Sequence, residues 1–274
     1  MSAEGLQRDR RLKRQKLYKQ EFRNNTPSWY RGEYHLGVIL AVTLGTIWLC
    51  TARIHEPTYW EWLLFVPMFF VGNWVEWAAH RYILHRPCPG LQMIYKRHCS
   101  VHHQFFIDAD LTYNGQKEWR ALLFPPFASI GFILVAIPPA LIIGWLWSPN
   151  AGYLIVAQMA GYYLMYEGLH TMSHLDDAKH PYLTRLPLVN TVRRMHREHH
   201  NLLKMQTTNF NLTFPICDAL FGTSDLDRGI LGTLFNGASN RHERAHGGDT
   251  PKNPPTEFYG ELEDYYGEVD KTSA

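Results

Sequence analysis

The histidines of this 274-residue chain are concentrated in four short windows. Ten of the 15 histidines fall within residues 80–85, 98–103, 170–174 and 196–200, where uniform scattering would place about one. Imidazole is a common metal ligand, and it suits iron, zinc, copper and nickel alike. The four windows therefore predict a metal site, although the ligand type alone does not name the metal.

The candidate ligands are His80, His85, His98, His102, His103, His170, His174, His196, His199 and His200. Residues three and four apart share one face of a helix, so the third and fourth windows can each aim their imidazoles at one point, and the second nearly so. His80 and His85 are five apart and need a helix end or a local distortion to converge. Ten neutral imidazoles are too many for one tetrahedral zinc. Two metals with five ligands each keep an open position for oxygen or a bridging ligand.

Four apolar stretches predict the helices that position these windows: residues 36–52, 60–79, 127–147 and 151–169. About 20 residues of helix reach roughly 30 Å, the thickness of the hydrocarbon layer of a bilayer. The third stretch contains Pro138 and Pro139, which predict a kink or a split into a hairpin. The predicted fold is an all-α integral membrane protein. It has about four transmembrane helices and a cytoplasmic helical cap that carries a dinuclear metal site.

The basic residues predict the orientation of these helices. With the amino terminus inside, residues 1–31, 80–118 and 170–274 are the inner segments, and they hold 25 of the 27 Lys and Arg residues. The positive-inside rule then places both termini and the metal site in the cytoplasm, with residues 53–59 and 148–150 as short outer loops. A bacterial inner membrane and an endoplasmic reticulum both remain open as the host membrane.

The charge pattern predicts three parts of the chain. Residues 1–33 form a basic cytoplasmic segment, either lying on an anionic leaflet or solvated, residues 34–227 form the membrane domain, and residues 228–274 form a flexible tail rich in Gly, Pro and acids. The net charge of +2 excludes a nucleic-acid binder driven by overall charge. The four cysteines show no C-x-x-C spacing, which excludes zinc ribbons and thioredoxin-type redox sites.

The order H-x4-H, H-x3-H-H, H-x3-H and H-x2-H-H on four predicted spans resembles the fatty acid hydroxylase/sterol desaturase superfamily of membrane histidine-box oxygenases. Residues 161–166 before the third box, Asn209-Phe210-Asn211 and residues 218–223 are similar to flanking motifs of that superfamily. The resemblance covers residues 72–224. The second box has three residues between its first two histidines where many relatives have two.

The resemblance implies a non-haem site of two Fe ions, with Zn possible as purified, and O₂ as co-substrate. It implies ligand roles for all ten histidines, and no further catalytic residue is assigned. The implied reaction is hydroxylation of an unactivated C–H bond of a lipid. Hydroxylation of a fatty-acyl chain is favoured over desaturation or sterol methyl oxidation, and carotenoid hydroxylation is a further alternative. The chain lacks a fused cytochrome b5 domain and a G-x-G-x-x-G fingerprint. We therefore expect electrons from a separate cytochrome b5- or ferredoxin-like protein with its reductase.

Three acidic residues are candidates to orient the imidazoles. Glu76 precedes His80 by four residues, Glu167 precedes His170 by three, and Glu198 lies inside the last box. Acidic side chains at the ends of membrane helices are costly unless they are paired. These acidic side chains either hold the metal-binding imidazoles in place or are simply solvated at the membrane interface.

Two other classes of function compete with the oxygenase. The run His242-Glu243-Arg244-Ala245-His246 matches H-E-x-x-H, the zinc metalloprotease signature, which needs a helix that presents both histidines. It lies in a polar stretch rich in Gly and Pro, without an apolar helical face. A non-enzymatic metal-binding membrane protein, such as a carrier, is the other alternative. Carriers place their ligands near the bilayer midplane, whereas these histidines cluster at the inner ends of the predicted spans.

Overall fold

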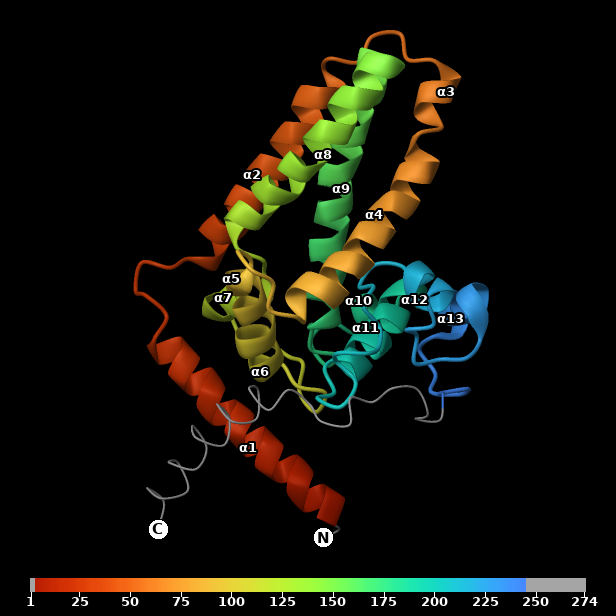
Figure 1. Ribbon diagram of the computed structural model, residues 1–274. Coiled ribbons are helices and arrows are strands. Elements are labelled where there is room, and N and C mark those ends of the chain that lie inside the picture. Colours follow the sequence, from red (N-terminus) through yellow and green to blue (C-terminus); the bar gives the residue numbers. More distant parts are fainter. Residues whose placement is uncertain (1–2, 245–274) are drawn as a thin grey trace.

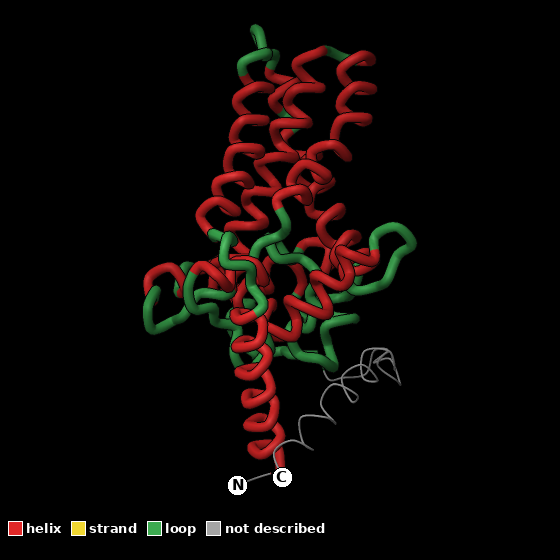
Figure 2. The backbone as a smooth tube through the Cα atoms, turned by 90° about the vertical axis from the view of Figure 1, so that its left-hand side faces the viewer, coloured by secondary structure: helices red, strands yellow, loops and turns green. Residues whose placement is uncertain are grey.

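The computed structural model describes residues 3–244, which form a helical bundle above a second layer of short helices (Figure 1). The long helices of the bundle are α2 Gly32–Thr51, α4 Phe65–Ala79, α8 Pro126–Leu146 and α9 Pro149–Ser173. The bundle and the second layer are also separate in the view turned by 90° (Figure 2). The described residues contain isolated bridges but no extended strand, so the all-helical prediction is confirmed for them.

The second layer, called here the lower layer, comprises residues 80–122 and 174–244. Its elements up to α7 are η1 His80–Leu84, α5 Gln92–Tyr95, η2 Lys96–His102, α6 His103–Phe105, η3 Gln116–Glu118 and α7 Trp119–Leu122. The elements that follow α9 are α10 Pro181–Thr184, α11 Pro187–His199, α12 Ile216–Leu220 and α13 Gly229–Asn236. This layer lies at the end of the bundle where α4 is followed by His80 and where α9 carries His170.

Three helical stretches are long and apolar enough to cross a membrane: Gly32–Thr51, Tyr59–Leu84 and Gln116–Leu146. Val135 and Leu141 of α8 are both 68% exposed, which suits a helix face surrounded by lipid. The helix α9 is 25 residues long and packs against α2, α4 and α8. It is less apolar than these helices because it carries Glu167 and His170, so its role as a fourth span stays a prediction.

The helix α8 runs unbroken through Pro138 and Pro139, so the predicted split into a hairpin does not occur. Apolar helices tolerate an internal proline where neighbouring helices accommodate the freed backbone groups. Gly152 of α9 permits close packing on α8, because a Cβ atom there would lie 2.7 Å from the carbonyl oxygen of Ala140. The two helices are therefore held in contact along their length.

The short turn between α8 and α9 is tied to α3 Tyr59–Trp62. Ser148 is the N-cap of α9 and accepts a hydrogen bond from the amide of Ala151, while its hydroxyl donates to Glu61. Glu61 also closes a capping box with Thr58 at the start of α3. The turns of the bundle far from the histidines are therefore linked by side-chain hydrogen bonds.

The basic amino-terminal segment forms a long helix, α1 Ala3–Asn24, which packs on the lower layer. Gln15 donates to the carbonyl oxygens of Phe105 and Asp110, at 2.8 and 2.7 Å. Lys19 forms an ion pair of 3.0 Å with Asp110, and Phe22 meets the ring of Phe105 edge-on. The helix α1 thus supports the segment that carries the second box. The sequence had predicted only a basic segment that lies on an anionic leaflet or is solvated.

The predicted flexible tail from residue 228 contains the helix α13, which packs against α11 and α12. The carbonyl oxygen of Leu234 accepts from the hydroxyl of Thr191 on α11. Thr233 of α13 is buried, and Ile230 and Leu234 are half-buried, whereas Leu231 and Phe235 stay exposed. Residues 245–274 of the predicted tail lie outside the described residues.

Candidate metal centre

The ten candidate histidines are all buried and lie together where the bundle meets the lower layer. Their inward nitrogens form two groups. The first histidine group consists of His80, His85, His98, His103 and His199, whose ligand nitrogens lie within 4.8 Å of one another. The second histidine group consists of His102, His170, His174 and His196. His200 adjoins the second group, with its Nε2 3.0 Å from the Nε2 of His196.

The two groups do not follow the boxes. The second and fourth boxes each supply ligands to both groups. In the second box, His98 and His103 belong to the first group and His102 belongs to the second. In the fourth box, His199 belongs to the first group and His196 belongs to the second. The expectation that the fourth box aims at one point is therefore wrong. A helix turns by about 100° per residue, so neighbours three apart can face two adjacent points. The groups are in direct contact, with the rings of His103 and His200 stacked at 4.2 Å.

Two π-helical turns bring residues five apart together. The amide of His85 donates to the carbonyl oxygen of His80 at 3.2 Å, and η1 and η2 continue this wider pattern in both boxes. In a π-turn residue i pairs with residue i+5, and such turns are frequent at functional sites. The Nε2 atoms of His80 and His85 consequently lie 3.2 Å apart, and those of His98 and His103 lie 3.1 Å apart. This is the local distortion that the five-residue spacing required.

Backbone carbonyls orient the imidazoles from behind. In five histidines Nδ1 lies 2.6–3.1 Å from a carbonyl oxygen, and these pairs are His80 with Phe210, His102 with Ala121, His174 with Leu111, His199 with Thr208 and His200 with Phe106. A carbonyl only accepts, so Nδ1 carries the proton and Nε2 keeps a free lone pair. Partners of this kind commonly orient metal-binding histidines and fix their tautomer.

The free lone pairs converge at short range. The Nε2 of His85 lies 2.9 Å from that of His199, and the Nε2 of His196 lies 2.8 Å from that of His174. A shared proton can satisfy one such pair, but five of the ten rings have already committed their Nδ1 proton to a carbonyl oxygen, so the Nε2 atoms of these five can only accept. A metal cation satisfies every inward lone pair at once. The donor set of both groups therefore fits a bound metal of the type that imidazole prefers.

Burial favours the neutral form of eight of the candidate histidines. It lowers the pKa of His85, His98, His103, His174, His196 and His200 well below 6.5, with a further contribution from neighbouring imidazoles. For His102 and His199 burial lowers the pKa to about 4, although their carbonyl partners oppose the shift. A neutral imidazole is the form that binds a metal, so these side chains are ready to do so near pH 7.

The three predicted acidic partners do not touch an imidazole through any hydrogen bond among residues 3–244. Glu76 accepts from the amide of Thr213 and from the hydroxyl of Tyr162, at 3.0 and 2.6 Å. Glu167 accepts from Tyr163, and Glu198 pairs with a lysine. Glu76 instead holds the loop that follows Phe210, whose carbonyl oxygen orients His80. Glu76 therefore supports the orientation of His80 only indirectly, through this loop.

The motif Asn209-Phe210-Asn211 is the centre of this loop. Asp218 accepts from the amides of Phe210 and Asn211, at 2.9 and 2.8 Å, and from the hydroxyl of Thr223 at 2.6 Å. Asn209 adopts a left-handed conformation with φ of 56° and pairs with Asp225. Residues 218–223 were expected only as a flanking pattern, and Asp218 was assigned no role, because two of its partners are backbone amides that no residue type marks.

An arginine joins the third and fourth boxes. Arg193 of α11 donates to the carbonyl oxygen of Met172 at 2.6 Å, at the last turn of α9, and pairs with Asp177. A cation suits this place because the last carbonyls of a helix are unpaired and partly negative. The contact positions His196 beside His174. Cys99, whose Sγ lies 3.5 Å from the Nδ1 of His85, was likewise missed by the sequence reasoning, for a lone cysteine gives no signal there.

The competing H-E-x-x-H motif is only partly covered by the structure, since Ala245 and His246 lie outside the described residues. His242 has φ of 68°, and Glu243 forms an isolated bridge with Leu226 and an ion pair with Lys204. The described part is therefore a turn, not the helix that zinc protease chemistry requires.

This difference gives a direct test of the protease alternative. His242→Ala is expected to leave the metal content of the purified protein unchanged, because His242 lies in neither histidine group. Elemental analysis of the variant beside the unaltered protein measures this. A loss of metal comparable to that caused by a change in the histidine boxes would restore the protease reading.

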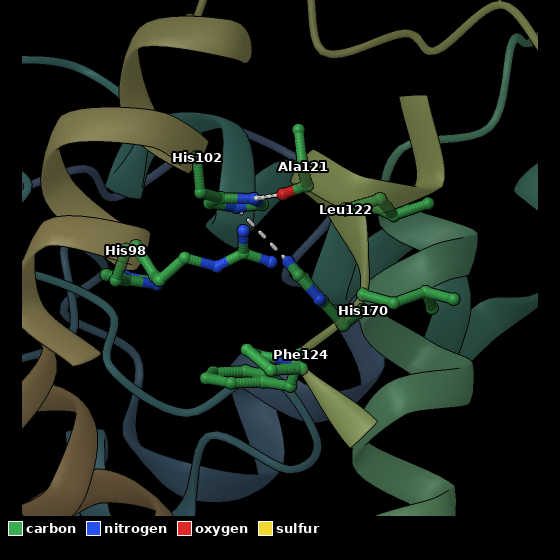
Figure 3. A pocket seen from close by; sticks show the side chains of 9 residues that line it. His98, His102, Ala121, Leu122, Phe124 and His170 are labelled. Carbon is green, nitrogen blue, oxygen red and sulfur yellow. Dashed lines mark hydrogen bonds between the residues drawn. The ribbon is translucent and has the colours of Figure 1, made fainter. Parts of the chain in front are cut away.

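A pocket of about 280 Å³, including its open mouth, lies against both histidine groups. His98 and His102 line one side, and His170 lies across from them with its Nε2 3.3 Å from that of His102 (Figure 3). Apolar residues 121–125 complete the wall. Such a pocket can admit a small ligand or part of a larger one to the inward nitrogens.

The sequence model of one family, described as fatty acid hydroxylase, matches residues 62–223. The matched region is more than half of the 274 residues and contains all ten candidate histidines. Comparisons with curated proteins and with solved structures found no significant match.

Proposed function

The chain belongs to the fatty acid hydroxylase family, and from this premise we propose that it is an O₂-dependent membrane di-iron oxygenase that hydroxylates a fatty-acyl chain. The observation that carries the proposal is the convergence of ten buried imidazoles, whose Nε2 lone pairs face one another in two adjacent groups. Imidazole binds several transition metals, and the family favours iron among them.

In this proposal the first histidine group and the second group with His200 each hold one Fe ion. Bound iron supplies the activation of O₂ and the removal of a hydrogen atom from a C–H bond. The overall change is RH + O₂ + 2e⁻ + 2H⁺ → ROH + H₂O, so one oxygen atom enters the lipid and the other leaves as water. The two electrons come from a separate carrier protein of the cytochrome b5 or ferredoxin class.

The chain's own residues would orient and shelter this site. The carbonyls behind five of the imidazoles fix the Nε2 of these rings toward the centre. Fully buried Phe106 and Phe210 lie against the rings of His174 and His80, at 4.1 and 5.7 Å, and exclude water from that side. A dry and rigid surrounding favours a positioned substrate and limits side reactions.

We further propose the membrane arrangement that the basic residues predict. In it α9 is a fourth span beside the three apolar stretches, and the lower layer faces the cytoplasm. Both termini then lie on the same side as the metal site. A lipid substrate would reach the pocket from the inner leaflet, next to the start of α8.

The proposed reaction is tested with the purified, iron-loaded protein in lipid nanodiscs, supplied with a reductant, a carrier protein and ¹⁸O₂. We expect one ¹⁸O atom in a hydroxylated acyl chain, detected by mass spectrometry, and none in samples kept free of O₂. A new double bond without ¹⁸O would move the proposal to the desaturase branch of the superfamily. Metal-dependent cleavage of peptides with no lipid product would contradict it.

A further inference from the structure

An arginine without an acidic partner lines the pocket beside the metal centre. Arg97 belongs to η2 and directly precedes His98, and its Nη2 donates to the carbonyl oxygen of Arg120 at 2.9 Å. Within residues 3–244, no carboxylate forms an ion pair with Arg97 or with Arg120. The pocket wall therefore carries positive charge that the described protein does not neutralise.

Two other arginines of the lower layer have acidic partners. Arg193 pairs with Asp177 at 2.6 Å, and Arg194 pairs with Asp225 at 2.5 Å. Partly buried guanidinium groups usually acquire such a partner, because removing their charge from water is costly. Arg97 has no such acidic partner among residues 3–244. An anion in the pocket would supply it.

The pocket places this charge next to the histidines. Arg97, His98, His102 and His170 line the same cavity, and the last three belong to the two histidine groups. Figure 3 shows His98, His102 and His170 around one space, with Phe124 on a further side. A ligand that meets the guanidinium of Arg97 is therefore held beside the metal centre.

We propose that Arg97 binds the anionic head group, a carboxylate or a phosphate, of the lipid substrate, and that the oxidised carbon lies within a few bonds of that head. The inference rests on the proposed oxygenase function. A planar guanidinium recognises both kinds of oxyanion through paired N–H donors. The pocket, about 280 Å³ with its open mouth included, is too small for a whole long-chain lipid, so only the head and the adjoining carbons enter.

The rest of the acyl chain leaves along the apolar wall. Leu122, Leu123, Phe124 and Pro125 line the pocket and lead into α8, which lies within a candidate membrane span. A chain that follows this path passes from the pocket into the hydrocarbon layer. Specificity then comes from the charge at one end and from apolar contact along the rest.

The experiment measures binding of three ligands that share one alkyl chain: hexadecanoate, hexadecyl phosphate and the neutral hexadecanol. The full-length protein is titrated in nanodiscs of zwitterionic lipid by calorimetry. Arg97→Gln is expected to weaken binding of both anions by about 10-fold or more, as removal of a charged hydrogen bond does. Binding of hexadecanol is expected to change by less than about twofold, because it makes no ionic contact.

Two variants serve as controls. Arg97→Lys keeps the charge and is expected to retain most of the anion preference. Arg86→Gln removes a positive charge from an exposed side chain outside the pocket and is expected to leave all three affinities unchanged. Equal weakening of anions and alcohol in Arg97→Gln would mean a purely structural role and overturn the inference, and so would no weakening at all.

The position of the oxygen in the product separates this inference from the proposed function. Hydroxylation close to the carboxylate of hexadecanoate supports both. Hydroxylation at the far end of the chain would overturn the inference and leave the oxygenase standing. Selective binding of the anions through Arg97 with no oxygenated product from any of the three ligands would support the head-group site and contradict the oxygenase.

Discussion

Replacement of His80 and His85 by alanine is expected to remove one metal from each chain and leave the other in place. Both residues belong to the first histidine group, and neither contributes to the second. His170→Ala/His174→Ala is expected to remove the other metal for the same reason. Lipid oxidation should be lost in both variants, because the proposed reaction uses the two metals together. Elemental analysis of anaerobically purified protein, beside product analysis, measures both effects.

A double variant of the last box would behave differently. His199 belongs to the first group and His200 adjoins the second, so His199→Ala/His200→Ala weakens both sites. The matched control is His55→Ala, an exposed histidine outside both groups. Loss of all metal both in His80→Ala/His85→Ala and in His170→Ala/His174→Ala would show a single cooperative site. An unchanged metal content would show that these histidines are not ligands.

Asp218→Asn is expected to weaken metal binding at the first group alone. Asp218 holds the amide of Phe210, and the carbonyl oxygen of Phe210 orients His80 at 2.6 Å. An asparagine side chain presents an NH₂ group where one carboxylate oxygen accepted, so a buried donor loses its partner. Removing such support typically costs about 10- to 100-fold in metal affinity. It also destabilises the fold by about 1–3 kcal/mol.

The pair variants make this prediction specific. In the His170→Ala/His174→Ala background only the first group remains, and there Asp218→Asn should lower the affinity measured by competition with a chelator. In the His80→Ala/His85→Ala background it should have little effect. Asp227→Asn, an exposed carboxylate nearby in the chain, is the control. Equal weakening in both backgrounds would assign Asp218 to general stability, not to the first group.

The sequence was sufficient to find the ten histidines, the long apolar helices and the family, since each depends on residue types and on spacing along one segment. The division of ligands was not accessible in this way. Whether His102 joins His98 or His170 depends on π-helical turns and on how η2 packs against α9. The spacing of His80 and His85 indicated a distortion in the first box, but nothing in the sequence indicated the π-turn of the second box, and ideal helical geometry predicts a different grouping.

The partners behind the imidazoles were hidden for a related reason. Carbonyl oxygens of Leu111, Ala121 and Thr208 hold the rings, and any residue type offers the same oxygen. The acidic side chains predicted for this role do not contact the imidazoles, and Glu76 holds only the loop that follows Phe210. The packing of α1 was likewise hidden, because a run of lysines and arginines gives no sign of which loop it meets.

The long reach of α1 has a consequence for how the chain assembles during synthesis. Gln15 bonds to Phe105 across 90 residues, and Arg23 pairs with Glu118 across 95. A growing chain emerges from its amino terminus at about 5–20 residues per second, so α1 waits several seconds before its partners exist. By then the first two apolar stretches have been made. The helix α1 therefore docks only after the second box and the residues that follow it, up to Glu118, have been made.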